Sequence, residues 1–143
     1  MKKRCTLFKV FALVVTIALG QSVWGQQQSS GASEGVSIKS MVLTTEVVER
    51  APVDSVQTFT ASDSEAFCHI RVQNSGEPTT VTFRWLHNGE EYFTFDAKVG
   101  VSSNWRTYSS VTPRPGEWQV QILAPNGDLL TERTFMVEQE QSG

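Results

Sequence analysis

Apolar and polar residues alternate with a period of two along most of the chain after residue 35, and this alternation predicts β-strands with one buried face. The clearest case runs from Gly116 to Val137, where two alternating runs flank the turn residues Pro125-Asn126-Gly127. An even-length loop at this turn places Trp118 opposite Phe135, so that both rings lie on one face. A single hairpin is only marginally stable in water, and we therefore expect further strands to cover this face.

The same register makes two further predictions for this hairpin. It places Ala124 opposite Leu129 near the turn, and it places Arg133 on the apolar face beside Val120. A charged side chain is almost never fully buried without a partner. The position of Arg133 therefore requires that this end of the domain be open to water.

Residues Thr79 to Leu86 and Glu91 to Val99 form a second predicted hairpin, and parity decides the length of its loop. A two-residue turn would send the apolar side chains of the two strands to opposite faces, because a shift of one residue flips every side chain. A three-residue loop, His87-Asn88-Gly89 with Gly89 left-handed in a bulge, aligns the apolar faces and sets Phe83 opposite Phe93. We therefore expect the odd-length loop.

The remaining strands follow from the same pattern, and no helical period occurs after the first 25 residues. We expect strands from about Val36, with a bulge near Met41, over Val56 to Thr60 as a short edge strand, over Glu65 to Gln73, and over Asn104 to Val111. About seven strands at regular spacing predict an all-β domain, an immunoglobulin-like antiparallel β-sandwich, over residues 36–138. A polar tail, residues 139–143, follows it.

Cysteine usage predicts that the sandwich has no disulfide. Cys68 and Trp85 fall where immunoglobulin domains have their first cysteine and their core tryptophan, but Trp118 and Val120 occupy the region of the second cysteine. Cys68 alternates with the apolar residues Ala66, Ile70 and Val72. We expect a buried thiol, with aromatic packing in place of the cross-sheet bridge; an intermolecular bridge is the alternative.

The first 25 residues have the layout of a signal peptide. Four basic side chains (Lys2, Lys3, Arg4 and Lys9) precede a short apolar run, and small residues follow it. Cleavage is expected after Gly25, or else after Gly20, and residues 26–35 are expected to be a flexible linker. An uncleaved anchor or a buried helix is the alternative. The pattern predicts a periplasmic or secreted protein.

Loss of the leader makes the chain strongly acidic. It removes four of the 12 basic side chains and none of the 15 acidic ones, which leaves 8 against 15 and a formal charge of −7. Such a charge repels phosphate backbones, so nucleic acid is not an expected partner. Contact with a membrane is expected only through an uncleaved leader.

Several short segments together resemble the bacterial Domain of Unknown Function 2914 family. These segments lie between about residues 36 and 137: Thr44 to Asp54, Phe83-Arg84-Trp85, Asn104 to Ser110, Pro115 to Val120, and Arg133 to Val137. The run Trp105-Arg106-Thr107-Tyr108-Ser109 is the most specific of them. Members of the family usually have His-Arg-Trp where this chain has Phe83-Arg84-Trp85, so a role for that histidine does not transfer. The resemblance implies an exported or envelope-facing β domain and no known activity.

Four side chains are the candidate ligand contacts: Arg84, Trp105, Arg106 and Tyr108. Arg84 is expected on an outer face beside Tyr92, in a cation–π contact. If its strand and that of Arg106 lie in one sheet, guanidinium and phenol groups share a face suited to recognition. The alternative is structural, with Arg106 paired to Glu117 or Asp96. Trp85 and Trp118 are assigned to the core, and Trp105 is left open between core and surface.

No catalytic or metal-binding motif appears in the sequence, and no cofactor is expected. The two histidines, His69 on the outward side of a strand and His87 in a hairpin loop, are expected to be structural or surface residues. The leading hypothesis is a non-enzymatic module that binds a protein or an envelope glycan through one sheet face. The alternative is an assembly protein that pairs through an edge strand. An enzyme is the third hypothesis.

Overall fold

The computed structural model describes residues 35–141, which form ten strands and no helix. The predicted signal peptide and all but the last residue of the predicted linker lie outside the described residues. No helix able to cross a membrane occurs within 35–141. The strands are β1 (Val36–Thr44), β2 (Val47–Val48), β3 (Ala51–Pro52), β4 (Thr58–Thr60), β5 (Ala66–Asn74), β6 (Thr79–His87), β7 (Glu90–Val99), β8 (Ser102–Val111), β9 (Gly116–Leu123) and β10 (Leu129–Glu138).

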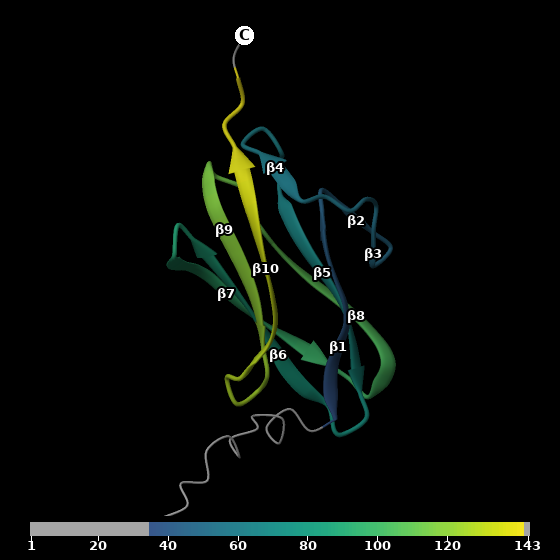
Figure 1. Cartoon of the computed structure of the whole chain (residues 1–143). Coiled ribbons are helices and arrows are strands. Elements are labelled where there is room, and N and C mark those ends of the chain that lie inside the picture. The colour runs from purple at the N-terminus through teal and green to yellow at the C-terminus, as the bar shows by residue number, and fades with distance from the viewer. Residues whose placement is uncertain (1–34, 142–143) are drawn as a thin grey trace, which may run out of the picture.

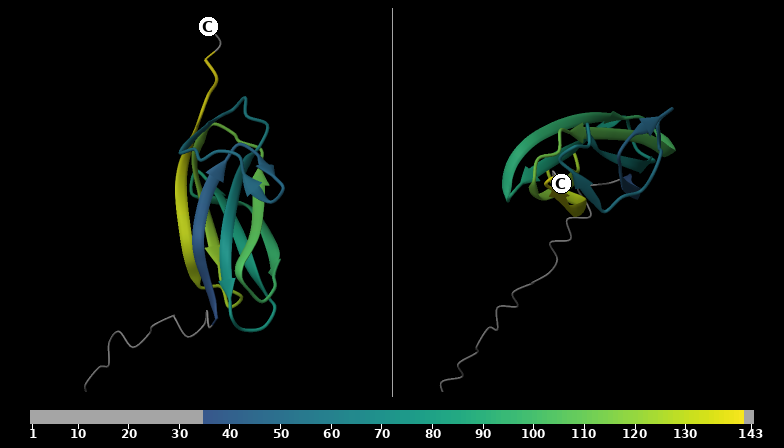
Figure 2. Two further views of the ribbon diagram at one scale, coloured as in Figure 1. Left: turned by 90° about the vertical axis from the view of Figure 1, so that its right-hand side faces the viewer. Right: turned by 90° about the horizontal axis from the view of Figure 1, so that it is seen from above.

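Two sheets pack face to face. One has the order β1-β5-β8 and the other β4-β10-β9-β6-β7, and β2 with β3 forms a separate ribbon (Figure 1). The left view of Figure 2 faces the three-stranded sheet, where β1 lies between β5 and the yellow strand β10. This arrangement confirms the predicted immunoglobulin-like sandwich. It has more strands than the seven expected, and β4, correctly predicted as an edge strand, pairs with β10 in parallel.

Aromatic rings fill the space between the sheets. Trp118 stacks on Phe135 with ring centroids 6.1 Å apart, and Trp85 meets the same ring edge-on at 6.2 Å. The indole of Trp85 donates a hydrogen bond to the Ser109 hydroxyl at 3.1 Å, so its buried N–H is satisfied. Cys68 lies nearby as a buried free thiol. Trp85 and Trp118 are core residues, as predicted, and no disulfide joins the sheets within residues 35–141.

The final hairpin follows the predicted register only away from its turn. Trp118 lies opposite Phe135, as expected. The prediction that Ala124 faces Leu129 is wrong, because an irregularity after Leu129 shifts the strands and sets this residue opposite Leu123. Ala124 instead closes the loop: its N–H donates to the Asp128 carbonyl at 2.7 Å, and its carbonyl accepts from Gly127 N–H at 2.8 Å.

The β6–β7 hairpin aligns its apolar faces as predicted, but by a different route. The turn has two residues, Asn88 and Gly89, both with positive φ (52° and 83°), rather than the expected three. A bulge in β7 next to the turn restores the parity, so that Phe83 lies opposite Phe95 instead of Phe93. The extra residue lies in the strand and not in the loop. Parity shows that an extra residue is present but does not distinguish between these two positions.

The first strand and its continuation differ in detail from the expectation. The β1 irregularity lies between Ile38 and Ser40, just before the expected position at Met41. The break at Pro52 is also a pairing site, because Pro52 lies opposite Val47 in the β2–β3 ribbon. This ribbon rests on the outside of the three-stranded sheet, where it covers His69.

Candidate binding groove

On one side of the sandwich, the outer edges of β7 and β8 are both free within residues 35–141. β7 pairs only with β6, and β8 pairs only with β5, so neither has a second neighbour. The two strands are joined through Gly100 and Val101. Trp105 packs directly on this connection, since a Cβ added to Gly100 would lie 2.8 Å from its ring. The groove between β7 and β8 is therefore closed at the Trp105 end.

Aromatic side chains line the groove without being covered. Phe93 and Phe95 lie opposite Trp85 and Phe83 on the inner face of the sheet, yet 42% and 41% of their surface is exposed, whereas the two partners are fully buried. Tyr108 on β8 is 41% exposed and faces the same groove. β7 is the last strand of its sheet in the described range, and its inner-face residues stay exposed near the turn with β6, whereas Ala97 and Val99 farther along the same face are buried.

Two adjoining cavities make up the groove. One has a volume of about 240 Å³ and is lined by Phe93, Phe95, Tyr108, Ser109 and Ser110. The other, of about 390 Å³, shares Phe95 and Tyr108 with the first and extends along β8 to Trp105 and Arg106. The groove thus follows the free edge of β8 from Trp105 to Ser110, and Phe93 and Phe95 line it at the Ser110 end.

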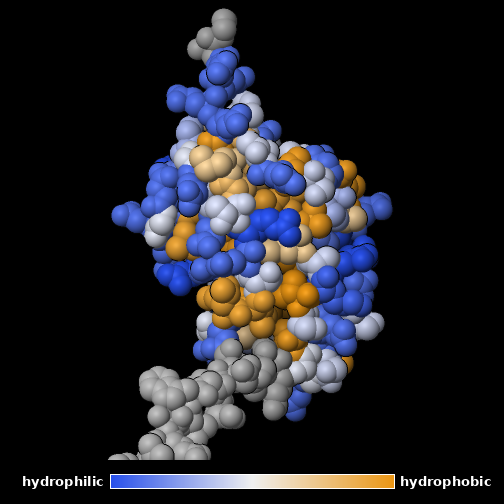
Figure 3. Space-filling view, viewed as in Figure 1, coloured by the Kyte–Doolittle hydropathy of each residue, from blue (hydrophilic) through white to orange (hydrophobic). Residues whose placement is uncertain are grey.

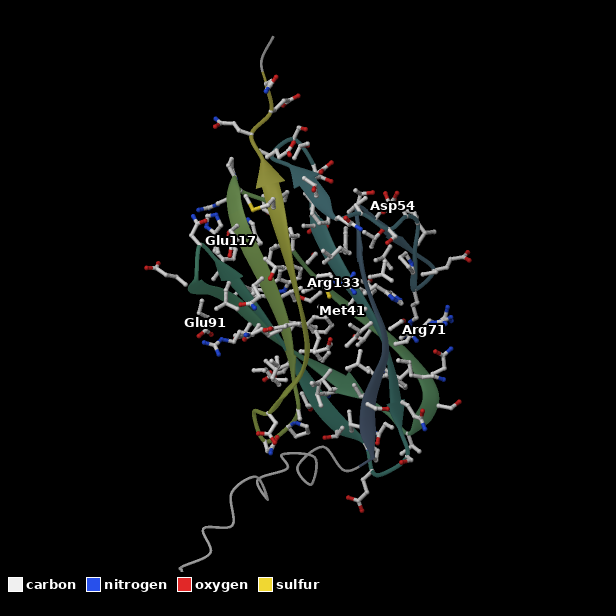
Figure 4. The ribbon with its side chains drawn as sticks, viewed as in Figure 1. Met41, Asp54, Arg71, Glu91, Glu117 and Arg133 are labelled. Carbon is white, nitrogen blue, oxygen red and sulfur yellow. The ribbon has the colours of Figure 1, made fainter. Side chains whose placement is uncertain are left out.

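Basic side chains gather beside this edge although the chain as a whole is acidic. Arg50, Lys98 and Arg106 line the larger cavity, and Arg71 lies opposite Arg106 in the adjacent strand. Figure 4 shows Arg71 projecting outward from the three-stranded sheet. None of the four has a carboxylate within ion-pair distance among residues 35–141, where the single ion pair joins two other residues.

The β2–β3 ribbon places Arg50 at the groove. Glu49 and Arg50 form its turn with positive φ values of 50° and 63°, a strained conformation for residues other than glycine. The ring Nε2 of His69 lies 2.9 Å from the Arg50 carbonyl oxygen and anchors this turn. Burial lowers the pKa of His69, and the nearby Arg106 and Arg71 lower it further, although the hydrogen bond to Arg50 opposes them. His69 is therefore neutral at pH 7 and donates from Nε2.

Three of the four predicted contact residues meet in this groove. Trp105, Arg106 and Tyr108 all line the larger cavity, with Trp105 half-buried against the core. Neither Glu117 nor Asp96 lies within ion-pair distance of Arg106, so the predicted structural pairing is not found.

Arg84 does not join them, because it lies on β6 in the other sheet. The condition that Arg84 and Arg106 share a sheet is therefore not met. Arg84 lies 3.6 Å from the Glu91 carboxylate, and its buried Nε has no hydrogen-bond partner within the described residues. The predicted cation–π contact of Arg84 with Tyr92 is wrong, since Arg114 takes that place at 5.6 Å from the ring centroid.

Sequence reasoning missed five residues of the groove. The alternation predicted that Phe93 and Phe95 are core residues. Alternation indicates which face of a sheet a side chain occupies, but it does not indicate whether another strand covers that face. The remaining three are the basic residues Arg50, Arg71 and Lys98. The number of basic residues was the one sequence feature that could have indicated them, because half of the eight basic residues after the leader lie at this groove. Their strands are far apart in the sequence, so the count alone does not show that they meet.

The histidines and the described cysteine make packing and backbone contacts within the sandwich. Within 35–141 there is no cluster of three or more potential metal ligands. His87 stacks on Trp118 with centroids 4.5 Å apart, and its Nε2 lies 3.0 Å from the Pro115 carbonyl. Burial raises the pKa of the Cys68 thiol far above its usual range, although Arg133 opposes this shift. Both histidines and the described cysteine therefore serve the packing of the sandwich.

Comparison with known proteins finds a family match over part of the chain and no activity. The model of the family DUF2914, described as a protein of unknown function, matches residues 78–137. The match confirms the resemblance from β6 to β10 and covers less than half of the chain. A search of curated proteins found no match. Among solved structures, a CARDB domain of the PF1109 protein from Pyrococcus furiosus, crystallised with di-metal ions, is 14% identical, covers 71% of this chain and 88% of that one, and has a TM-score of 0.39.

Proposed function

We propose that this DUF2914-like chain is a non-enzymatic binding module that holds an extended segment of a partner protein in the groove between β7 and β8. The observation that supports it most is the exposure of Phe93 and Phe95 on the inner face of a free edge. Exposed apolar surface of this kind marks interaction sites in soluble proteins. The added segment would pair with β8 and cover both rings.

The free backbone groups favour a polypeptide over a glycan as the ligand. An edge strand offers a row of unpaired N–H and C=O groups that match another strand. β8 pairs without interruption from Trp105 to Val111, so this stretch of its other edge is regular and straight enough to accept one. A glycan would use the aromatic rings but would leave this row of backbone groups unmatched.

Assembly from copies of this chain is the second candidate, and charge disfavours it. Pairing of two β8 edges would bring Arg71 and Arg106 of one copy close to the same residues of the other. Like charges at such distances repel, and no carboxylate in the described part of the chain neutralises either arginine. The edge is better suited to a different partner.

Export remains part of the proposal and rests on the sequence alone. The basic and apolar pattern of residues 1–25 is that of a secretory leader. Edman sequencing of the protein isolated from the envelope and medium tests it: a mature N-terminus at Gln26 or Gln21 supports export, and an unprocessed chain in the cytoplasm contradicts it.

The binding proposal is tested by selecting peptides on the folded chain. A random peptide library is selected against the wild type, and the enriched peptides are then measured on Phe93→Thr/Phe95→Thr and on the control Leu129→Thr. Leu129 is somewhat more exposed, at 50%, but lies on β10 away from the groove. We expect at least about tenfold weaker binding to the double variant and no change for the control.

Backbone methylation of the enriched peptide separates strand addition from simple apolar contact. Alternate residues of a strand direct their N–H groups to the same neighbour, so methylation at one parity should abolish binding and at the other leave it. Tolerance at every position, or equal binding to the double variant, would contradict the proposal.

A further inference from the structure

A strand added at the free edge of β8 has two faces whose surroundings differ. Side chains of one parity point to the interior, on the same side as Trp105, Thr107 and Ser109. Those of the other parity point outward, on the side of Arg106 and Tyr108. The two faces of the ligand therefore meet different surfaces, and the identity of each surface predicts the ligand sequence.

The inner face meets aromatic rings. Phe93 and Phe95 stand across the groove, and the cavity between them and β8 has mainly apolar walls. Polar ligand side chains would lose their water here without gaining a partner. Residues of the inward parity are thus expected to be apolar.

The outer face meets basic side chains that have no carboxylate partner within 35–141, followed by the Tyr108 ring and, at its far end, Ser110, whose hydroxyl donates to the Glu65 carboxylate at 3.3 Å. Arg106 lies on β8 next to the added strand, Arg71 follows in the adjacent strand, and Arg50 reaches the same edge from the β2–β3 ribbon. Arginine forks match carboxylates in geometry as well as in charge. Residues of the outward parity are thus expected to be acidic.

The β7 edge does not offer the same complement. Its outward residues mix both charges: Asp96 accepts a hydrogen bond from the Thr82 hydroxyl at 2.7 Å, Thr94 lies opposite Arg84, and Lys98 has the same parity. An acidic ligand residue beside Asp96 would be repelled. The charge distribution therefore selects β8 as the pairing edge.

We infer that the groove binds a segment in which apolar and acidic residues alternate, with the apolar set against Phe93 and Phe95 and the acidic set against Arg71 and Arg106. This inference rests on the proposed function and adds the chemistry of the partner. The free edge from Trp105 to Ser110 spans roughly 20 Å at about 3.3 Å per residue, which accommodates about six ligand residues.

Three blocked peptides of about eight residues test the inference by calorimetry on the full chain. They consist of repeated Val-Glu, Val-Gln or Val-Lys and differ only at the alternate polar position. We expect the Val-Glu peptide to bind about tenfold more tightly than the Val-Gln peptide at low salt, the Val-Lys peptide to show no binding, and added salt to reduce the difference. Oligogalacturonate serves as an anionic glycan probe.

Matched charge variants locate the effect. Arg71→Gln/Arg106→Gln should remove the preference for Val-Glu over Val-Gln, whereas Arg133→Gln, which loses an exposed cation on the other side of the sandwich, should retain it. Unchanged melting temperatures show that the variants fold.

The outcomes separate this inference from the proposed function. Equal binding of Val-Glu and Val-Gln would overturn the acidic ligand but leave strand addition standing. Binding of neither would overturn both. A preference that survives in Arg71→Gln/Arg106→Gln would overturn the site, and arginine-dependent binding of oligogalacturonate without peptide binding would replace the peptide by a glycan.

Discussion

The two open sides of the sandwich differ in the regularity of their edge strands. On the β1–β10 side, both edge strands are irregular, between Ile38 and Ser40 in one and after Leu129 in the other. On the β7–β8 side, β7 has a bulge near its turn and β8 shifts register beyond Trp105, but β8 pairs regularly from Trp105 to Val111 and its free edge is uncovered. Bulges and inward-pointing charges are the usual means by which proteins block unwanted strand pairing. Both strands are interrupted on the β1–β10 side, whereas the regular stretch of β8 is available for a ligand.

Other groups strengthen the protection of the β1–β10 side. Val56 N–H donates to the Leu43 carbonyl at 2.9 Å, and β4 pairs with the end of β10. Figure 4 shows Arg133 and Met41 between β10 and β1, and Figure 3 shows hydrophilic surface across the middle of this side, with apolar surface below it. Arg133 stays exposed at an inward position, which explains why the sequence places a charge beside Val120.

Truncation of one phenylalanine on each side should give the largest contrast. Phe59 on β4 is 1% exposed and meets Phe135 at 5.3 Å, so Phe59→Ala should cost about 3–5 kcal/mol of unfolding free energy. Phe95→Ala should cost no more than about 1–2 kcal/mol, because much of its ring is already in water. Urea unfolding measures both. Equal losses would show that Phe95 is a core residue and not part of a binding surface.

A methyl group at the closed end of the groove should have the next largest effect. In Gly100→Ala the new Cβ would lie 2.8 Å from the Trp105 ring, which must move. Overpacking of this kind costs about 1–3 kcal/mol, and we expect the low end because Trp105 is only half-buried. The variant should also shift the tryptophan fluorescence and weaken peptide binding in the groove. A variant with wild-type stability and spectrum would contradict the placement of Trp105.

Acid should loosen the ribbon that holds Arg50 at the groove. The folded state lowers the pKa of His69 from its usual 6.5, so the unfolded state binds the proton more readily. The stability that neutral His69 contributes is full above about pH 6.5 and declines as the pH falls toward the folded-state value. Between pH 7 and 5, the free energy of unfolding should decrease more steeply with falling pH in the wild type than in His69→Gln. Identical profiles would show that His69 is not buried as described.

The smallest effect concerns the thiol between the two sides. Burial raises the pKa of Cys68, so this thiol should not react with a thiol reagent in the native protein, whereas it should react at once in the urea-unfolded chain. Phe59→Ala should increase the reaction rate of Cys68 in the native protein more than Phe95→Ala does. Rapid labelling of Cys68 in the wild-type protein would contradict a closed core.

Alternation predicts faces well and edges poorly. It identified Trp85, Trp118 and Phe135 as shared core residues and the edge position of β4 because each of these follows from local spacing. It placed Phe93 in the core because nothing in the local sequence reports that β7 is the last strand of its sheet. The separation of Arg84 from Arg106 likewise depends on which sheet each strand joins, and that is decided by packing across the whole domain.

Short insertions are a second limit. The bulges at the β6–β7 and β9–β10 turns each change which residues are opposite each other while keeping the buried face. Parity detects that an odd residue is present, but its position depends on turn geometry. The gathering of Arg50, Arg71 and Arg106 required two strands and a ribbon to be placed in space before it could be seen.

Hydrogen exchange of the β8 amides with and without the Val-Glu peptide tests the central claim most directly. We expect alternate amides between Trp105 and Ser110 to exchange rapidly in the free protein and to become protected when the peptide binds, while amides of β1 and β10 remain unchanged. Protection that appears on β1 or β10 instead, or β8 amides that are equally protected in both states, would contradict the account.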